Sequence, residues 1–322
     1  MTRQSIVCSL TGICLLSATL AVARPQPPAS PSPAAGQDQA AGPLKQAQQS
    51  LREGDHEKAL ATLRDVIAKA PASSPEWAAA QLQTGIVLDL LGQYDEARTH
   101  IAKAIDAAAK PEDKARAQRT MAMSYAFQRN CDGAEKYEAP LYESYLAAKD
   151  FYAAGDVANE LARVCLESGG FDKAATWYKR GYEAGLQEPG ITPERRDLWE
   201  FRWEHAQARI AARRGNQAEA KTHVAAARAV FDKGTNPEQA PFVPYLSGYV
   251  AFYGGDYQAA LAELQKGNQN DPFILSLIAQ AYEKLGDKAQ ATEYYRKVLA
   301  SNAHNPTNAF ARPLAKERLG TK

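Results

Sequence analysis

The residues that could do chemistry in this chain do not have the spacings that catalytic or metal sites use. No two histidines lie four residues apart, and the sequence contains no HExxH, CxxC or GxSxG motif. The five histidines are His56, His100, His205, His223 and His304. Asp55, Asp256 and Asp287 each directly follow a glycine in an expected turn, where a carboxylate typically caps the backbone. We therefore predict no metal, no cofactor and no enzymatic activity.

Charge and composition exclude further classes of protein. The chain has 38 Lys and Arg residues and 37 Asp and Glu residues, so it lacks the basic surplus of a nucleic-acid-binding protein. Hydrophobic residues make up 45% of the 322 positions, enough for a sizeable core. The many alanines favour helices that approach one another closely.

The N-terminus has the pattern of a secretory signal. Arg3 precedes a mostly apolar stretch from Ile6 to Leu20, and Ala21-Val22-Ala23 fits the cleavage pattern of small residues. We expect residues 1–23 to be a signal peptide, with retention as an anchor as the alternative, and the protein to be periplasmic or extracellular. Residues 24–42, rich in Pro, Ala, Ser and Gln, are expected to be a disordered linker.

The rest of the chain repeats a fixed pattern around a set of glycines. These are Gly54, Gly92, Gly169, Gly215, Gly255 and Gly286. Five residues after each lies an alanine, at Ala59, Ala97, Ala174, Ala220, Ala260 and Ala291. Nine residues after each lies an apolar residue, at Leu63, Ile101, Tyr178, Val224, Leu264 and Tyr295. This pattern predicts pairs of antiparallel helices, with glycine in the turn and small residues where the helices cross.

The segments GQYDEARTHIAKAI, GDYQAALAELQKG and GDKAQATEYYRKVL resemble tetratricopeptide repeats. The resemblance implies an all-α, right-handed superhelical solenoid of about six to seven helix pairs. We expect the repeat array to cover residues 43–304 and a polar capping helix and tail to cover 305–322.

One repeat is expected to be degenerate, because Gly92 and Gly169 are separated by about two repeat lengths. Its turn is expected near Asn130–Gly133, with Ala134 in the small position. Pro140 should kink or break its second helix. In the repeat that turns at Gly215, the first helix is expected to be long and to begin near Thr192.

Cys131 and Cys165 are the two cysteines that remain after signal cleavage. Cys131 falls in the turn of the degenerate repeat, and Cys165 falls near the end of the next first helix. Adjacent first helices stack in this family, and an exported protein meets an oxidising environment. We expect either a disulfide between them or two unpaired, packed cysteines.

In tetratricopeptide repeats the first helices line the concave groove, and this register gives candidate ligand-binding residues. Four fall on the Gly215 repeat, at Arg202, His205, Arg209 and Arg213, and Arg163 falls on the repeat before it. The next repeat contributes Tyr245, Tyr249 and Tyr253. Arginine binds carboxylates in bidentate fashion, and tyrosine gives a large contact area. The alternative is that the arginines are solvated and the tyrosines pack between repeats.

We therefore expect an exported scaffold or adaptor that binds a protein or extended peptide in its groove. The partner is expected to be acidic or to bear a carboxylate, with no nucleic acid and no membrane span after cleavage. Two other hypotheses stay open. One is a structural subunit of a cell-envelope assembly, and the other is an enzyme or carbohydrate-handling protein built on the repeats.

Overall fold

The computed structural model describes residues 42–72 and 74–321, and within them every regular element is helical. The expected signal peptide and all but the last residue of the expected linker lie outside the described residues. Residue 42, placed in the linker by the sequence, is instead the first residue of α1. No helix in the described part of the chain is long and apolar enough to span a membrane.

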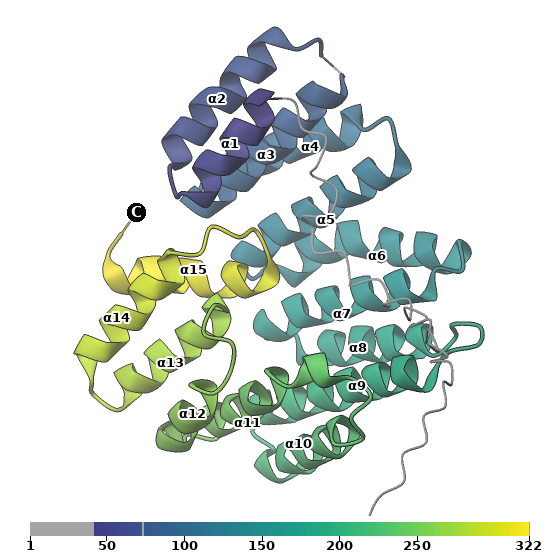
Figure 1. Ribbon diagram of the computed structural model, residues 1–322, viewed down its shortest axis with the longest axis vertical. Helices are drawn as coiled ribbons and strands as arrows, with labels where there is room; N and C mark the ends of the chain where they lie inside the picture. The colour runs from purple at the N-terminus through teal and green to yellow at the C-terminus, as the bar shows by residue number, and fades with distance from the viewer. Residues whose placement is uncertain (1–41, 73, 322) are drawn as a thin grey trace, which may run out of the picture. The chain divides into compact units, whose positions relative to one another are not determined.

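Between residues 42 and 321, fourteen α-helices of the described chain form seven antiparallel pairs, and a fifteenth follows them (Figure 1). The pairs are α1 (Gly42–Arg52) with α2 (His56–Lys69), α3 (Pro75–Leu91) with α4 (Tyr94–Ala107), α5 (Pro111–Phe127) with α6 (Cys131–Ala147), α7 (Phe151–Glu167) with α8 (Phe171–Gly185), α9 (Pro193–Arg213) with α10 (Gln217–Phe231), α11 (Phe242–Tyr253) with α12 (Tyr257–Leu264), and α13 (Pro272–Lys284) with α14 (Lys288–Leu299). A short 3₁₀ turn, Pro237–Gln239, precedes α11, and α15 spans Pro306–Leu319. The fold is an all-α solenoid of helix pairs.

The helices cross closely because small residues lie at the crossings. A Cβ atom added at Gly85 would lie 2.4 Å from Cγ1 of Ile101, and one at Gly248 would lie 2.6 Å from Cγ of Leu264. Both partners are the apolar residues nine positions after a turn glycine, and both are fully buried. Any larger side chain at these crossings would push the two helices apart.

The degenerate repeat turns without glycine. Its turn residue is Arg129, which has a φ of 53°, and α6 begins directly afterwards at Cys131. The Asn130 side chain caps α6 by accepting the N–H of Gly133 at 2.9 Å. The turn therefore ends slightly before the expected Asn130–Gly133 segment. The αL conformation costs a non-glycine residue energy, and here Arg129 recovers some of it by donating to the carbonyl of Glu167 at 2.9 Å.

The expected break at Pro140 is not seen, because α6 continues as one helix from Cys131 to Ala147. A proline inside a helix removes one backbone hydrogen bond and crowds the preceding turn. Leu141 and Tyr142 are buried directly after it, and their packing holds the helix across the missing bond. The expected start of the long first helix near Thr192 agrees with α9, which Thr192 caps.

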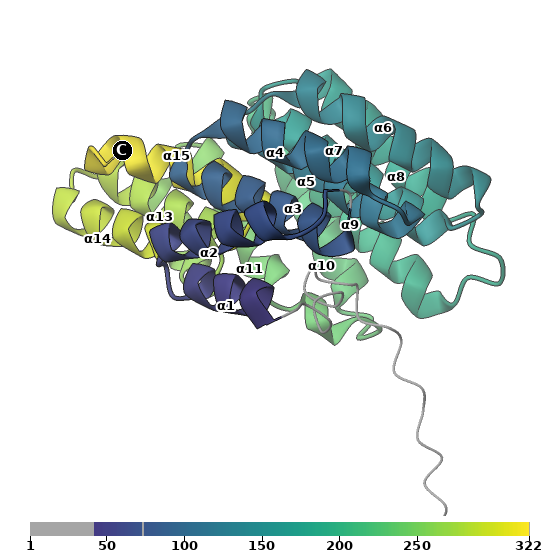
Figure 2. The same ribbon diagram turned by 90° about the horizontal axis from the view of Figure 1, so that it is seen from above.

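The last helix, α15, does more than cap the end of the array. It packs against α13 and α14, and it also reaches α5 and α7 (Figures 1 and 2). Arg312 Nε donates to the carbonyl of Leu90 at 2.8 Å, and Lys316 Nζ donates to the carbonyl of Leu91 at 2.7 Å. Cations near the carboxyl end of α3 also suit its helix dipole. We call the contacts of α15 with α3, α5 and α7 the closing contact.

The expectation of a polar capping helix is therefore wrong for the middle of α15. Phe310 is 1% exposed and Arg312 is 6% exposed. Arg129 Nη2 donates to the carbonyl of Phe310 at 3.3 Å. The middle of the helix is buried because it is packed on two sides, by the end of the array and by earlier first helices.

A buried polar group strengthens the closing contact. His304 Nε2 lies 2.8 Å from Oδ2 of Asp89, and Ser124 Oγ donates to Oδ1 of Asp89 at 2.7 Å. The carboxylate lies between the imidazole and the hydroxyl, so Ser124 bonds to the carboxylate and not to the imidazole, unlike the nucleophile of a Ser-His-Asp triad. The three residues come from α3, α5 and the segment before α15, and they join these elements.

Candidate binding site

The candidate residues lie on the first helices α7, α9 and α11, as the repeat register requires. The structure divides them into a partly exposed group and a buried group. Arg163, Arg202, Arg213 and Tyr253 are partly exposed, whereas His205, Arg209, Tyr245 and Tyr249 are buried. The expected stripe is therefore not a continuous open surface.

The open part of the first-helix face is polar and is held by ion pairs between neighbouring repeats. Arg119 of α5 lies 2.6 Å from Glu160 and 3.4 Å from Asp156, both on α7. Arg202 of α9 approaches the other oxygen of Asp156 at 3.8 Å. The side chains of Arg119, Asp156 and Arg202 keep 32%, 36% and 26% of their surface exposed. We call these three residues the open charged strip.

The buried part of the face is filled by aromatic rings. His205 stacks on Tyr245 with centroids 5.5 Å apart, and Tyr249 contacts Tyr253 at 4.6 Å and Phe273 at 6.4 Å. Tyr249 is 0% exposed. The tyrosines at 245 and 249 therefore pack between repeats, which was the alternative to a ligand-contacting role.

Arg213 is anchored at the edge of this buried part. Its Nη1 lies 2.8 Å from Oε2 of Glu167, whose side chain is 1% exposed. The Tyr249 hydroxyl donates to the other oxygen of Glu167 at 3.2 Å. The guanidinium also lies over the ring of Tyr253 at 4.8 Å. Because its guanidinium has these partners, we infer that Arg213 mainly holds neighbouring side chains in place and contributes little free charge to the surface.

Arg163 and Arg209 lie deeper and have fewer partners. Arg209 is 5% exposed; its Nη2 donates to the Tyr178 hydroxyl at 2.8 Å and its Nε to the carbonyl of His205 at 3.3 Å. Arg163 Nη2 donates to the Tyr245 hydroxyl at 3.4 Å, and its guanidinium lies 5.1 Å from the ring of Phe273. Burial, together with the positive charges of Arg209 and Arg163, lowers the pKa of His205 well below its usual range.

A pair of carboxyl groups lies beneath the open charged strip and was not among the expected site residues. Glu138 of α6 is 0% exposed, and its pKa is raised well above the usual range, first by burial and then by the neighbouring Glu160. The pKa of Glu160 is lowered, because the Arg119 guanidinium outweighs its burial. Burial and the neighbouring Glu160 therefore both favour the neutral form of Glu138.

A sequence signal for Glu138 exists in retrospect. If Arg129 replaces the turn glycine, the residue nine positions later is Glu138, where the other repeats have an apolar residue. An acidic residue at a core position of a repeat indicates either a buried interaction or a functional group. Ala134, expected in the small position, lies five residues after Arg129, so the same register leads to Glu138.

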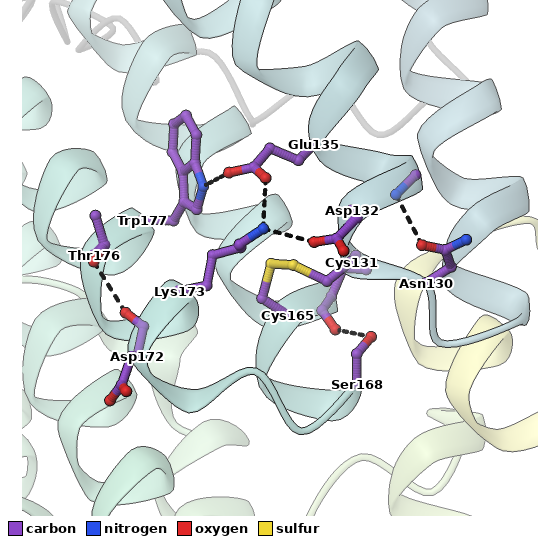
Figure 3. The surroundings of a disulfide bond; sticks show 12 residues. Asn130, Cys131, Asp132, Glu135, Cys165, Ser168, Asp172, Lys173, Thr176 and Trp177 are labelled. Atoms are coloured by element: carbon purple, nitrogen blue, oxygen red, sulfur yellow. Dashed lines mark hydrogen bonds and ion pairs between the residues drawn. A yellow bond between two sulfur atoms is a disulfide. The ribbon is translucent and has the colours of Figure 1, made fainter.

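The structure joins Cys131 and Cys165 in a disulfide between the start of α6 and the end of α7 (Figure 3). The sulfurs are 1.98 Å apart and the Cα atoms 4.7 Å apart. Beside it, Lys173 of α8 lies 2.6 Å from Asp132 and 2.8 Å from Glu135, and Trp177 donates to Glu135 at 2.8 Å (Figure 3). This covalent bond ties the repeat that lacks a turn glycine to the repeat that follows it.

Comparison with known families identifies the helix pairs. Residues 44–113 and residues 274–305 each match a model of the tetratricopeptide repeat. Both segments are therefore similar to tetratricopeptide repeats. The matched segments lie at the two ends of the array, and the degenerate repeat falls between them. No curated protein matches the chain significantly.

Two solved structures give the same fold. A tetratricopeptide repeat protein from Parabacteroides merdae ATCC 43184 has 14% identity and a TM-score of 0.50, covering 86% of this chain and 96% of its own. The apo form of RapI has 13% identity and a TM-score of 0.52, covering 86% and 97%. At this level of identity, the likeness concerns the fold alone.

Proposed function

We propose that this protein is an exported tetratricopeptide-repeat scaffold that binds a protein or peptide partner on the first-helix face of α5, α7 and α9. The observation that carries the proposal is the open charged strip. It crosses three consecutive repeats and remains exposed, whereas the stretch beyond it is filled by the protein's own aromatic rings. Helix-pair repeats present such faces to partners, and this one has the charges to recognise a polar segment.

The strip favours a partner that carries a carboxylate. Arg202 is held by Asp156 at 3.8 Å, which is longer than a close ion pair, and it remains partly exposed. An acidic side chain of a partner can therefore contact Arg202 without displacing a tight internal bond. Binding of this kind weakens as salt rises, because exposed charges are screened within about 10 Å at 0.1 M ionic strength.

The test is capture of partners by the mature chain from envelope extract, followed by titration of the captured protein. Arg202→Glu should reduce affinity at low salt. Arg228→Glu makes the same charge change at an exposed position of the second helix α10 and should leave affinity unchanged. Equal binding by both variants and the unmodified chain would refute the open charged strip as the site.

Export is the second part of the proposal and rests on the N-terminal sequence pattern. Residues 1–23 fused to alkaline phosphatase, which is active only after export, should give an active reporter. Replacing the apolar residues Leu15 and Leu16 with arginine should abolish the activity. A reporter that stays inactive with the natural segment would contradict export.

A further inference from the structure

Arg209 is a buried cation whose hydrogen bonds go to neutral oxygens. They are the hydroxyl of Tyr178 and the carbonyl of His205, at 2.8 and 3.3 Å. Its Nη1 atom is buried and has no hydrogen-bond partner among the described residues. A buried guanidinium normally has a carboxylate beside it and uses all of its N–H groups, because removing the charge from water is costly.

A second cation with a free donor lies on the neighbouring first helix. Arg163 Nε is buried and also has no hydrogen-bond partner in the part of the chain that the structure describes. The nearest acidic group that acts on it, Asp271, uses one carboxylate oxygen to accept the N–H groups of Phe273 and Ile274. Burial raises the pKa of Asp271, which weakens it further as a counter-charge.

A third unpaired nitrogen belongs to His205, on which the charges of both arginines act. His205 is 8% exposed, and its Nε2 atom has no hydrogen-bond partner within the described segments. Tyr245 connects the group, because its ring stacks on His205 at 5.5 Å and its hydroxyl accepts from Arg163 at 3.4 Å. Tyr245 thus contacts two of the three residues that carry an unpaired buried nitrogen, and Arg209 donates to the backbone of His205 at 3.3 Å.

An anion is the ligand that this arrangement lacks. Its oxygens would accept the free N–H groups of Arg163 and Arg209 and neutralise the buried charge, and Arg forks suit carboxylate and phosphate equally. Aromatic rings that cover Arg163 limit the size of the ligand. Phe273 of α13 and Phe310 of α15 cover Arg163, with ring centroids 5.1 and 6.0 Å from its guanidinium carbon. An extended peptide cannot lie where these rings pack.

We propose that Arg163, His205 and Arg209 form an internal site for a small anion that bears a carboxylate or an inorganic oxyanion group. Binding turns the Tyr245 side chain away from Arg163 and places anion oxygens on both guanidinium groups. The site is separate from the open charged strip, so the protein has an external face for a macromolecular partner and an internal site for a small ligand.

The experiment is thermal unfolding of the purified chain with added anions at constant ionic strength. Phosphate and sulfate form one arm, acetate and succinate form the other, and chloride is the reference. At least one oxyanion should raise the Tm in a saturable way, and the arm that does so identifies the source of the anionic group. If none raises the Tm above the chloride reference, the proposal is overturned.

Two arginines on the same face of α9 give a matched pair of variants. Arg209→Met should lose at least about tenfold in affinity for the stabilising anion, without a lower Tm in chloride, since it replaces an unpaired buried charge with an apolar chain. Arg202→Met, one heptad earlier, removes a partly exposed arginine that has Asp156 as its counter-charge at 3.8 Å, and it should keep the affinity. Equal affinities in both variants would also overturn the proposal.

Should Arg209→Met fail to fold, Arg163→Met removes the other guanidinium and tests the same prediction. Calorimetric titration of the unmodified chain with the stabilising anion supplies a second readout. No partner protein is present in these measurements, so their failure would leave the proposed function of the open charged strip unaffected.

Discussion

At the scale of single residues, His205 links stability to acid pH. Its folded pKa is lowered, so the unfolded chain takes up a proton near pH 6.5 while the folded chain does not. The unfolding free energy therefore falls as pH drops below about 6.5, by at most about 1.4 kcal/mol per pH unit from this group. Above that pH its contribution is constant.

We predict that His205→Gln flattens this acid-side loss. The measurement is denaturant unfolding of both proteins in chloride buffers from pH 7.5 to 5. His56 and His100, whose pKa values are also lowered mainly by burial, remain in the variant and keep part of the slope. Parallel curves for the two proteins would contradict the assignment.

Glu138 changes the unfolding free energy with pH in the opposite sense to His205. Its folded pKa is raised, so its contribution to stability is fully present below about pH 4.5 and is lost as pH rises toward the folded value. We predict that Glu138→Gln gains stability relative to the unmodified chain between pH 4.5 and 7.5. The amide is neutral at every pH, so burying it carries no cost that grows as pH rises. A stability difference that does not change with pH would contradict the raised pKa of Glu138.

At the scale of helices, the crossings between paired helices tolerate no added volume. Ala260 on α12 is 0% exposed, whereas Ala262 on the same helix is exposed. We predict that Ala260→Leu lowers the unfolding free energy by about 1–3 kcal/mol through overpacking, while Ala262→Leu changes it little. Denaturant unfolding of both variants checks this, and equal stabilities would show that the crossing lies elsewhere.

The disulfide supports the repeat whose turn has no glycine. It closes a loop with a sequence separation of 34 residues. The chain-entropy argument gives about 4 kcal/mol for a loop of this length. We predict a loss of about this size on reduction, and the same loss in a chain with Cys131→Ala and Cys165→Ala. A reduced protein as stable as the oxidised one would contradict it.

The helix pairs could be predicted from the sequence because their determinants are local. A glycine, an alanine five residues later and an apolar residue nine residues later report on one turn and one crossing. The glycine pattern did not predict Arg129 as a turn residue. This non-glycine residue adopts the αL conformation and donates a hydrogen bond to the carbonyl of Glu167 in the next repeat. Periodicity contains no information on such a contact.

The candidate site was predictable in its register but not in its exposure. Counting from the glycines places Arg209 and Tyr249 on the inner face, and the structure agrees. Whether that face is open depends on α13 and α15, which approach from later in the chain. Phe310 contacts this face only because the closing contact exists. The two sides of that contact lie far apart in the sequence, since Arg312 and Leu90 are separated by 222 residues.

At the scale of the whole described array, the closing contact couples distant repeats. Phe310 is 1% exposed and packs against Phe273 with centroids 6.0 Å apart. We predict that Phe310→Ala lowers the unfolding free energy by about 3–5 kcal/mol and raises amide hydrogen exchange in α3 and α5. Hydrogen-exchange mass spectrometry measures both regions.

The matched control lies on the other side of the same helix. Leu314 of α15 packs with the cluster formed by α13 and α14. Leu314→Ala should destabilise the end of the array and leave exchange in α3 and α5 close to that of the unmodified chain. If both variants affect only the last helices, α15 is a terminal cap and nothing more.

The closing contact also restricts how this protein can evolve. An open solenoid can gain or lose a helix pair by duplication or deletion, because each repeat contacts only its neighbours. Here Arg312 and Lys316 must return to the carbonyls at the end of α3. Inserting one repeat between α5 and α13 would carry α15 away from those carbonyls. The number of repeats is therefore fixed by geometry, and variation should accumulate in loops and outer faces instead of in repeat number.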